Sequence, residues 1–321
     1  MRKNFNVLLL TIIVIGIFIQ VGFAQDEIKE DLIMAGGGTT GVYYASAAAV
    51  GNLLVDELPY IKSAAAQVTG ASVENVRLLQ HGKADFGFAS AATVVKAMDK
   101  EEPFEKEDFD NLRTICWAHS SFYHFIVDAD SDIYSIEDFK GKRIRFDVPG
   151  SGAYVHIVQL LKEYGLSIDD VKPFMITSAW DAYKEGTIDV LPLGASLPYP
   201  YIVDIHKARP MRLIQLEPEK LDSFLENNKG YKIGVIPAGT YEGIDEDIIT
   251  TDAAATFLTH KDVPEELVYQ TVKLIAENIE RLMLSIVYFE DWTFTPDITD
   301  RTGCPLHPGA ERYYKEIGLI K

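Results

Sequence analysis

The stretch LIMAGGGTTG, residues 32–41, predicts a short buried strand followed by a glycine-rich loop. A helix of mostly small residues is expected directly after it, over about residues 42–56. The plan returns later in the chain, where RIRFDV (143–148) is a predicted strand, PGSG (149–152) its loop and residues 153–164 its helix. A strand, a glycine loop and a helix in this order are typical of α/β proteins.

Each of these units is followed by a second pair of matching features. One predicted helix ends at Gly82 before the strand FGFA (86–89), and another ends at Gly186 before the strand VLPL (190–193). Glycine just after a helix accepts the left-handed backbone conformation that commonly ends it. The alternation predicts mostly parallel sheets flanked by helices, and two lobes with separate sheets fit 321 residues better than one large sheet.

We therefore expect an α/β fold of two lobes with a ligand cleft between them. The predicted division assigns residues 25–122 and 237–321 to lobe 1, and residues 123–236 to lobe 2. Apolar segments rich in β-branched and aromatic residues, at 122–127 and 231–236, are expected to cross between the lobes.

The first 24 residues have the pattern of a secretory signal peptide. Arg2 and Lys3 precede an apolar run from Val7 to Phe23, and small residues lead to a cleavage site after Ala24. The alternative is an uncleaved membrane anchor, because the run is nearly long enough to span a bilayer. Either way the segment predicts a location outside the cytoplasm, in the periplasm.

The composition is that of a packed globular protein, with 47% hydrophobic and 24% charged residues. Acidic residues outnumber basic ones 48 to 30, which argues against a nucleic-acid partner because no basic excess is available to neutralise phosphates. The two cysteines, Cys116 and Cys304, are too few for a four-cysteine zinc site, and their spacing leaves open whether they pair.

The glycine loops predict an anion site. Helix N-termini carry unpaired backbone N–H groups and a partial positive charge, and glycine lets a ligand approach the backbone. Thr39, Thr40 and Ser151 supply hydroxyl groups nearby, while Tyr43 and Tyr44 fit a ligand pocket and the protein interior equally well. Two such loops, one per lobe, predict a cleft that holds a small organic anion from both sides.

Other sites are less favoured. GGGTTG also matches the dinucleotide fingerprint, but the next strand ends without the acidic residue that binds a ribose, so no nicotinamide cofactor is expected. His119 and His124 lie five apart on a predicted strand and would point to opposite faces, which makes a poor metal pair. A solvated strand face is the simplest interpretation of Arg143 and Arg145.

A set of blocks along the chain forms a recognisable pattern. They are GGTTGVYY (37–44), TGASVENVRLL (69–79), GKADFGF (82–88), PGSG (149–152), IPAGTY (236–241) and HPGAERYY (307–314). Together they resemble the TAXI family, the substrate-binding proteins of tripartite ATP-independent periplasmic (TRAP-type) transporters. The resemblance extends from about residue 31 to the end.

The resemblance implies a type II periplasmic binding protein that closes over its ligand at a hinge. It also implies delivery to membrane permease subunits driven by an ion gradient, and a ligand such as glutamate, glutamine or a related C5 dicarboxylate, with no cofactor. By similarity, the ligand-binding positions are Gly38, Thr39, Thr40, Tyr44, Ser151, Gly152 and Ala153, and the fold adds Ser90 and Gly194. The segments around Ser90 and Gly194 depart from the family pattern, which leaves the ligand open.

The sequence thus predicts a binding protein without catalytic residues that captures a small organic anion for a transporter. Two alternatives are a secreted hydrolase on the same scaffold, with Ser90 or Ser151 in its site, and a periplasmic sensor of the same ligand. For the leading hypothesis, Thr39→Ala or Ser151→Ala is expected to weaken binding by about 1–3 kcal/mol, the cost of leaving a buried polar group unpaired.

Overall fold

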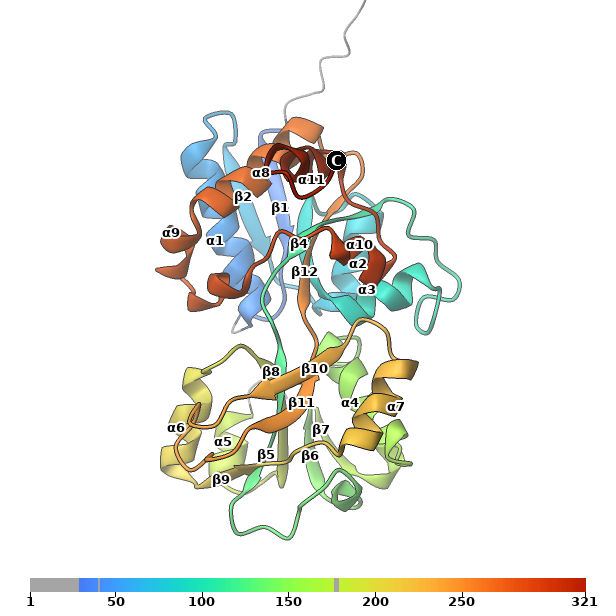
Figure 1. Ribbon diagram of the computed structural model, residues 1–321, viewed down its shortest axis with the longest axis vertical. Helices are drawn as coiled ribbons and strands as arrows, with labels where there is room; N and C mark the ends of the chain where they lie inside the picture. Colours follow the sequence, from blue (N-terminus) through green and yellow to red (C-terminus); the bar gives the residue numbers. More distant parts are fainter. Residues whose placement is uncertain (1–28, 40, 176–178) are drawn as a thin grey trace, which may run out of the picture.

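The computed structural model describes residues 29–39, 41–175 and 179–321, and the predicted signal segment 1–24 lies outside them. Within the described residues the chain forms two separate β-sheets, each covered by helices (Figure 1). The predicted α/β fold with two sheets is therefore confirmed. We call each sheet with its covering helices a lobe. None of the helices in this part of the chain combines the length and apolar character needed to cross a membrane.

The sheet of the first lobe has five strands, in the order β2-β1-β3-β12-β4. β12 runs antiparallel to both of its neighbours, and the other strands share one direction. Every residue of β3 is buried, as expected for a strand in a sheet covered on both faces. The strands are β1 (Asp31–Ala35), β2 (Ser63–Gln67), β3 (Phe86–Ser90), β4 (Leu112–Trp117) and β12 (Ala255–His260).

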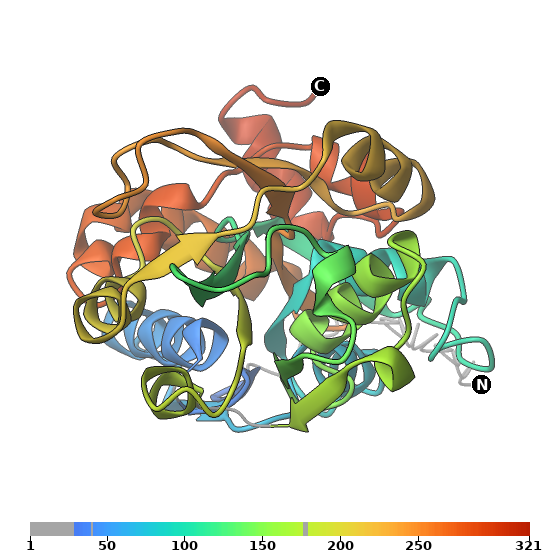
Figure 2. The same cartoon turned by 90° about the horizontal axis from the view of Figure 1, so that it is seen from below.

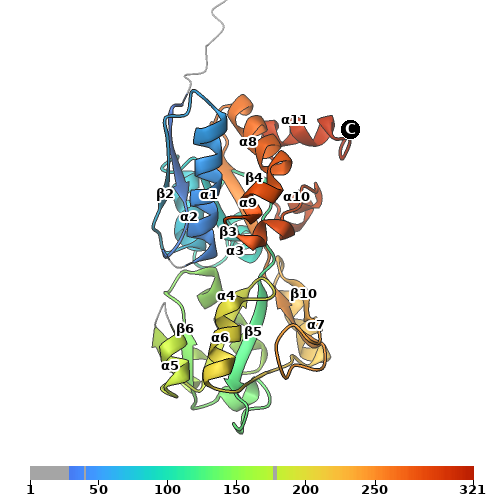
Figure 3. The same ribbon diagram turned by 90° about the vertical axis from the view of Figure 1, so that its left-hand side faces the viewer.

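Helices cover both faces of this sheet, because alternate residues of each strand point to opposite sides. On β3, Phe86 and Phe88 belong to one buried cluster with α1, α8 and α11, while Ala89 belongs to another with α2 and α3. The helices of the first lobe are α1 (Val42–Glu57), α2 (Ser72–Gln80), α3 (Ala91–Met98), α8 (Glu265–Glu277), α9 (Ile279–Met283), α10 (Asp297–Thr302), α11 (Pro308–Glu316) and the 3-10 helix η3 (Val287–Asp291). Figure 3 shows α1 and α8 on the same side of the sheet.

The sheet of the second lobe has seven strands, in the order β10-β11-β5-β8-β6-β7, with β9 paired to β5. The pairs β8–β6 and β6–β7 are parallel, and the remaining pairs are antiparallel. This sheet is therefore more mixed than the sequence predicted. The strands are β5 (Phe122–Asp128), β6 (Arg143–Phe146), β7 (Lys172–Met175), β8 (Val190–Ala195), β9 (Met211–Leu213), β10 (Lys232–Ile236) and β11 (Ile248–Asp252).

Two buried clusters again lie on opposite faces of the second sheet. Phe125 and Val127 of β5 belong to one cluster, with α4 and α7, and Ile126 belongs to the other, with α5 and α6. The helices of this lobe are α4 (Gly152–Glu163), α5 (Trp180–Lys184), α6 (Pro200–Ala208), α7 (Pro218–Asn227), η1 (Glu137–Phe139) and η2 (Ile168–Asp170). The second lobe lies in front of the first when the molecule is seen from below (Figure 2).

Two short segments, residues 118–121 and 253–254, join the lobes. They run side by side, because Ala255 N–H donates to the His119 carbonyl at 2.9 Å and Ala253 N–H donates to the Ser121 carbonyl at 3.0 Å. The paired connections leave the molecule a narrow waist (Figure 1).

The predicted second crossing, at residues 231–236, is wrong. These residues form β10, which pairs only with β11 in a hairpin at the edge of the second sheet. The chain thus stays in the second lobe through residue 252 and does not return at 237 as expected. Local composition does not distinguish an edge strand from a crossing strand, because both are apolar and β-prone.

Cys116 and Cys304 are both buried and free. The sequence left their pairing open, and the structure places each thiol in an apolar cluster of the first lobe. Burial raises the pKa of the Cys304 thiol to about 12.

Candidate ligand-binding site

The first glycine loop leads from β1 into α1. Gly41 is the N-cap of α1 and has no side chain to pair with the free N–H groups of the first turn. Its own N–H donates to the Gly38 carbonyl at 2.8 Å, which makes the turn compact. Gly36 must be glycine here, because a Cβ would lie 2.8 Å from the Tyr44 Cα. The loop therefore presents bare backbone at the start of α1.

The starts of α2 and α3 lie next to this loop. The Ser90 side chain caps α3 by accepting a hydrogen bond from Thr93 N–H. The Ser90 N–H donates at 3.0 Å to the hydroxyl of Ser72, which is the first residue of α2. The side-chain amide of Asn75 donates to the carbonyls of Gly36 and Phe88 at 2.6 and 2.7 Å. These buried hydrogen bonds from a side-chain amide connect the first loop to β3 and hold three helix N-termini together.

The second glycine loop leads from β6 into α4 in the other lobe. Ser151 caps α4 by accepting from Tyr154 N–H at 3.1 Å. Gly152 lies against the first lobe, where a Cβ would meet Ser90 Oγ at 2.8 Å and Ser72 Oγ at 3.0 Å. Across the same boundary Val73 N–H donates to the Gly150 carbonyl at 3.2 Å. The start of α4 is thus seated directly on the starts of α2 and α3.

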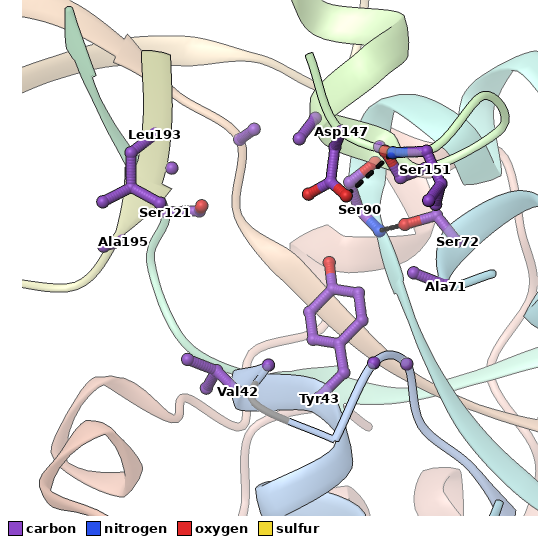
Figure 4. Close-up of a pocket in the computed structure, with 18 of the residues that line it drawn as sticks. Val42, Tyr43, Ala71, Ser72, Ser90, Ser121, Asp147, Ser151, Leu193 and Ala195 are labelled. Carbon is purple, nitrogen blue, oxygen red and sulfur yellow. Dashed lines mark hydrogen bonds between the residues drawn. The ribbon is translucent and has the colours of Figure 1, made fainter. Parts of the chain in front are cut away.

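A cavity of about 670 Å³ lies between the lobes and is lined by both of them. Six of the sequence-predicted positions line it: Gly38, Ser90, Ser151, Gly152, Ala153 and Gly194. Figure 4 shows the Tyr43 ring standing between two walls of this cavity, with Ser72, Ser90, Asp147 and Ser151 on one side and Val42, Leu193 and Ala195 on the other.

Two of the remaining predicted positions do not line the cavity. Thr39 is exposed and Tyr44 is half-buried, and neither lines the cavity. Thr40 lies outside the described residues. The helix periodicity explains why Tyr44 does not line the cavity. Adjacent helix residues point about 100° apart, so only one of the two neighbouring tyrosines, Tyr43, faces it.

Arg145 is the main residue that the sequence interpretation missed. It is buried and lines the cavity, so a solvated strand face is the wrong interpretation for it. Its guanidinium forms an ion pair with Asp147 at 2.8 Å, and Asp147 also accepts from the Val148 N–H. Arg143, two residues earlier, pairs instead with Asp189 and does not line the cavity. The position of Arg145 just before a glycine loop is the only local signal for its role.

Burial changes the titration of several groups in the lining. It raises the pKa of the Tyr43 phenol to about 12, with a smaller opposing contribution from the Ser72 hydroxyl. It lowers the pKa of His119 to about 4, so that the ring is neutral at pH 7. His119 packs against Tyr43, and its Nδ1 has no hydrogen-bond partner among the described residues.

An aromatic group continues the apolar wall of the cavity. Trp180 stacks on Tyr201 with ring centroids 5.0 Å apart, and Tyr199 lies 5.9 Å from Trp180. All three rings line the cavity. We call Trp180, Tyr199 and Tyr201 the aromatic cluster.

The charged side chains of the lining are Arg145 and Asp147, which pair with each other. No group of three or more histidine, cysteine, aspartate or glutamate residues within reach of one ion occurs in the described part of the chain. The lining instead offers a buried guanidinium, hydroxyl groups and helix N-termini, which are the groups that bind carboxylates, sulfonates and phosphates.

Solved structures with a similar fold come from several bacteria. XAC2383 of Xanthomonas citri, solved with ATP bound, is 13% identical with a TM-score of 0.52, and the match covers 90% of this chain and 96% of that one. A protein of Bordetella bronchiseptica RB50 is 13% identical with a TM-score of 0.50, covering 92% and 90%. The periplasmic aliphatic sulphonate binding protein SsuA of Escherichia coli is 14% identical with a TM-score of 0.45, covering 89% and 79%.

The two sheets thus give the chain the same overall fold as XAC2383 and the Bordetella bronchiseptica protein. The sequence model of the NMT1-like family matches residues 34–318. The chain therefore belongs to the NMT1-like family.

Proposed function

We propose that this protein is an extracytoplasmic solute-binding protein, which captures an organic anion and presents it to a membrane transporter. The observation that carries this function is the cavity of about 670 Å³ whose walls come from both lobes. A ligand held there touches both sides at once, so its binding energy depends on how the lobes are placed.

Local charge explains how an acidic protein would bind an anion. The starts of α2, α3 and α4 meet at one wall, and Ser72, Ser90 and Ser151 mark them. Each helix start contributes partial positive charge, and Arg145 adds a full positive charge to the cavity lining, where it pairs with Asp147. Gly38, Gly152, Ala153 and Gly194 complete the proposed ligand contacts through their backbone.

Closure would follow from the contacts between the lobes. Two contacts join one lobe to the other. They are the hydrogen bond from Val73 N–H to the Gly150 carbonyl and the ion pair of Lys229 with Asp99 at 3.3 Å. These bonds are absent from any arrangement in which the lobes separate, so ligand contacts and interlobe contacts form together. The paired segments 118–121 and 253–254 would then serve as the hinge.

The resemblance of the sequence blocks to the TAXI family supports a finer assignment. In this proposal the protein works in the periplasm, its signal segment is cleaved after Ala24, and its partners are TRAP-type permease subunits driven by an ion gradient. Uptake by membrane vesicles that carry the cognate permease would then require the gradient and not ATP. Uptake that depends on ATP hydrolysis would contradict the TRAP assignment and leave the binding function in place.

A hydrolase has no comparable support. The Ser90 hydroxyl contacts Thr93 at 2.8 Å and the Ser151 hydroxyl caps α4, so both serines have structural partners. Neither is hydrogen-bonded to a histidine in the described residues, whereas a nucleophilic serine needs an adjacent base.

A thermal-shift screen of the purified protein tests the binding function. The panel contains glutamate, glutamine and 2-oxoglutarate, which the resemblance favours, together with aliphatic and aromatic carboxylates and sulfonates. A ligand at a hundredfold excess over its Kd stabilises the folded protein by about 2.7 kcal/mol. If no organic anion raises the Tm, the proposed function is wrong.

A further inference from the structure

The cavity is large for the acids that the family resemblance implies. Its volume of about 670 Å³ lies within the ~300–1,000 Å³ of sites that hold drug-sized ligands. A five-carbon dicarboxylate is smaller than such ligands and fills only part of that space. Binding sites of this class normally bury most of the ligand surface, so the remaining volume needs an occupant.

The two walls differ in chemistry. One wall carries the hydroxyl groups of Ser72, Ser90 and Ser151 (Figure 4). The opposite wall carries Val42, Leu193 and Ala195 with the Ser121 hydroxyl beside them, and Tyr199 and Tyr201 follow β8 in the chain. The polar wall suits the anionic group of a ligand, and the more apolar wall suits a hydrophobic part of it.

The aromatic cluster has apolar surface left uncovered. Tyr201 is 47% exposed although it stacks on Trp180. Trp180 and Tyr199 are also only half-buried while they line the cavity. Uncovered aromatic faces gain from contact with another ring, because offset stacking adds to the burial of apolar area.

We propose that the ligand is an aromatic organic acid, with its anionic group at Arg145 and the start of α4 and its ring against the aromatic cluster. This assignment rests on the proposed function, since it names the class of anion that the same site binds. It replaces the C5 dicarboxylates with acids whose length spans both walls.

Matched pairs of acids test the assignment by calorimetry on the purified protein. Phenylpyruvate is compared with pyruvate, 4-hydroxyphenylacetate with acetate, and both aromatic acids with 2-oxoglutarate. We expect each aromatic acid to bind at least tenfold more tightly than its aliphatic partner and than 2-oxoglutarate. If 2-oxoglutarate binds as tightly as the aromatic acids, the aromatic assignment is overturned and the anion-binding function stands. If none of the acids binds, both are overturned.

Variants then locate the ring. Trp180→Ala is expected to reduce the aromatic-to-aliphatic affinity ratio at least fivefold, with little change in the affinity for the aliphatic acids. Tyr134→Ala is the control, because Tyr134 is 69% exposed and does not line the cavity. An equal loss for both kinds of acid in Trp180→Ala would mean that the cluster only supports the fold, and would overturn the placement.

Discussion

The two strand–loop–helix units, β1–α1 and β6–α4, look alike in sequence and differ in the structure. The β1–α1 loop ends in Gly41, which has no side chain to cap the helix, and a Cβ at Gly38 would have no neighbour within 4 Å. The β6–α4 loop ends in the capping residue Ser151, and Gly152 beside it is packed against the other lobe. One unit thus offers open backbone, whereas the other fits closely onto the opposite lobe.

The difference extends to charge. β6 brings Arg145 to the cavity, while the cavity-lining part of the β1–α1 unit carries no charged side chain: Gly37, Gly38, Gly41, Val42 and Tyr43. Two units with the same local pattern therefore have different proposed roles. The β6–α4 unit brings a charged side chain to the cavity and packs closely on the other lobe, whereas the β1–α1 unit presents backbone groups and the Tyr43 ring.

The largest expected effect is the loss of the charge on the β6 side. Arg145→Met should weaken binding of the best acid from the screen by about 1.5–3 kcal/mol, the range for a hydrogen bond to a charged group. Titration calorimetry measures the change. Arg143→Met is the matched control on the same strand, because Arg143 pairs with Asp189 outside the cavity lining. Equal losses in the two variants would contradict a special role for Arg145.

The close fit of α4 gives the next prediction. Gly152→Ala places a methyl group 2.8 Å from Ser90 Oγ, and overpacking of this kind costs about 1–3 kcal/mol. The cost falls only on the closed arrangement, so ligand affinity should decrease while the Tm without ligand changes little. At Gly38 an added methyl group meets no protein atom within 4 Å, so a loss of affinity in Gly38→Ala would come from the ligand contact and not from packing between the lobes. Small-angle scattering would show whether Gly152→Ala stays open with ligand, and a normal closed form would refute this account.

Buried histidines near the two units predict a pH dependence. Burial lowers the pKa of His119, beside α1, to about 4 and that of His156, on α4, to about 3, from 6.5. The unfolded chain binds these protons first, so stability is complete above pH 6.5 and decreases as the pH falls toward the folded values. Each ring contributes up to about 1.4 kcal/mol per pH unit in that window.

Urea unfolding at pH 7 and pH 5 measures this effect. His119→Phe should reduce the difference between the two pH values, because phenylalanine fills a similar volume and does not titrate. A wild-type free energy of unfolding that is the same at both pH values would contradict the prediction for both histidines.

The smallest effects separate the two hydroxyl residues that the sequence treated as equivalent. Ser151→Ala should lower stability by about 1 kcal/mol through the lost helix cap, and weaken binding further if its hydroxyl contacts the ligand. Thr39→Ala should change neither, because Thr39 is exposed and outside the cavity lining. Thermal unfolding and calorimetry on both variants check this, and an affinity loss in Thr39→Ala would restore the original expectation for the first loop.

Much of the fold followed from local patterns. The strand–loop–helix units around residues 32–41 and 143–152 occur where they were expected. Hydrophobic periodicity and glycine determine the secondary structure of the few residues around them, so such units can be predicted locally. The hairpin β10–β11 was missed, since strand pairing is a contact between segments and not a property of either one. The same limit means that local patterns could not show which loop residues line the cavity: Gly38 and Ser151 do, and Thr39 does not.

The sequence alone determined two α/β lobes, glycine loops at helix starts and an overall acidic composition. Only the tertiary structure decided that Arg145 is buried in the cavity lining, that Gly152 has no room for a side chain, and that three aromatic rings gather in the same lining. The fit of Gly152 depends on how one lobe lies on the other, and the other two depend on how elements of the second lobe pack together. Residues that are neighbours in space but distant in the chain leave no local pattern to detect.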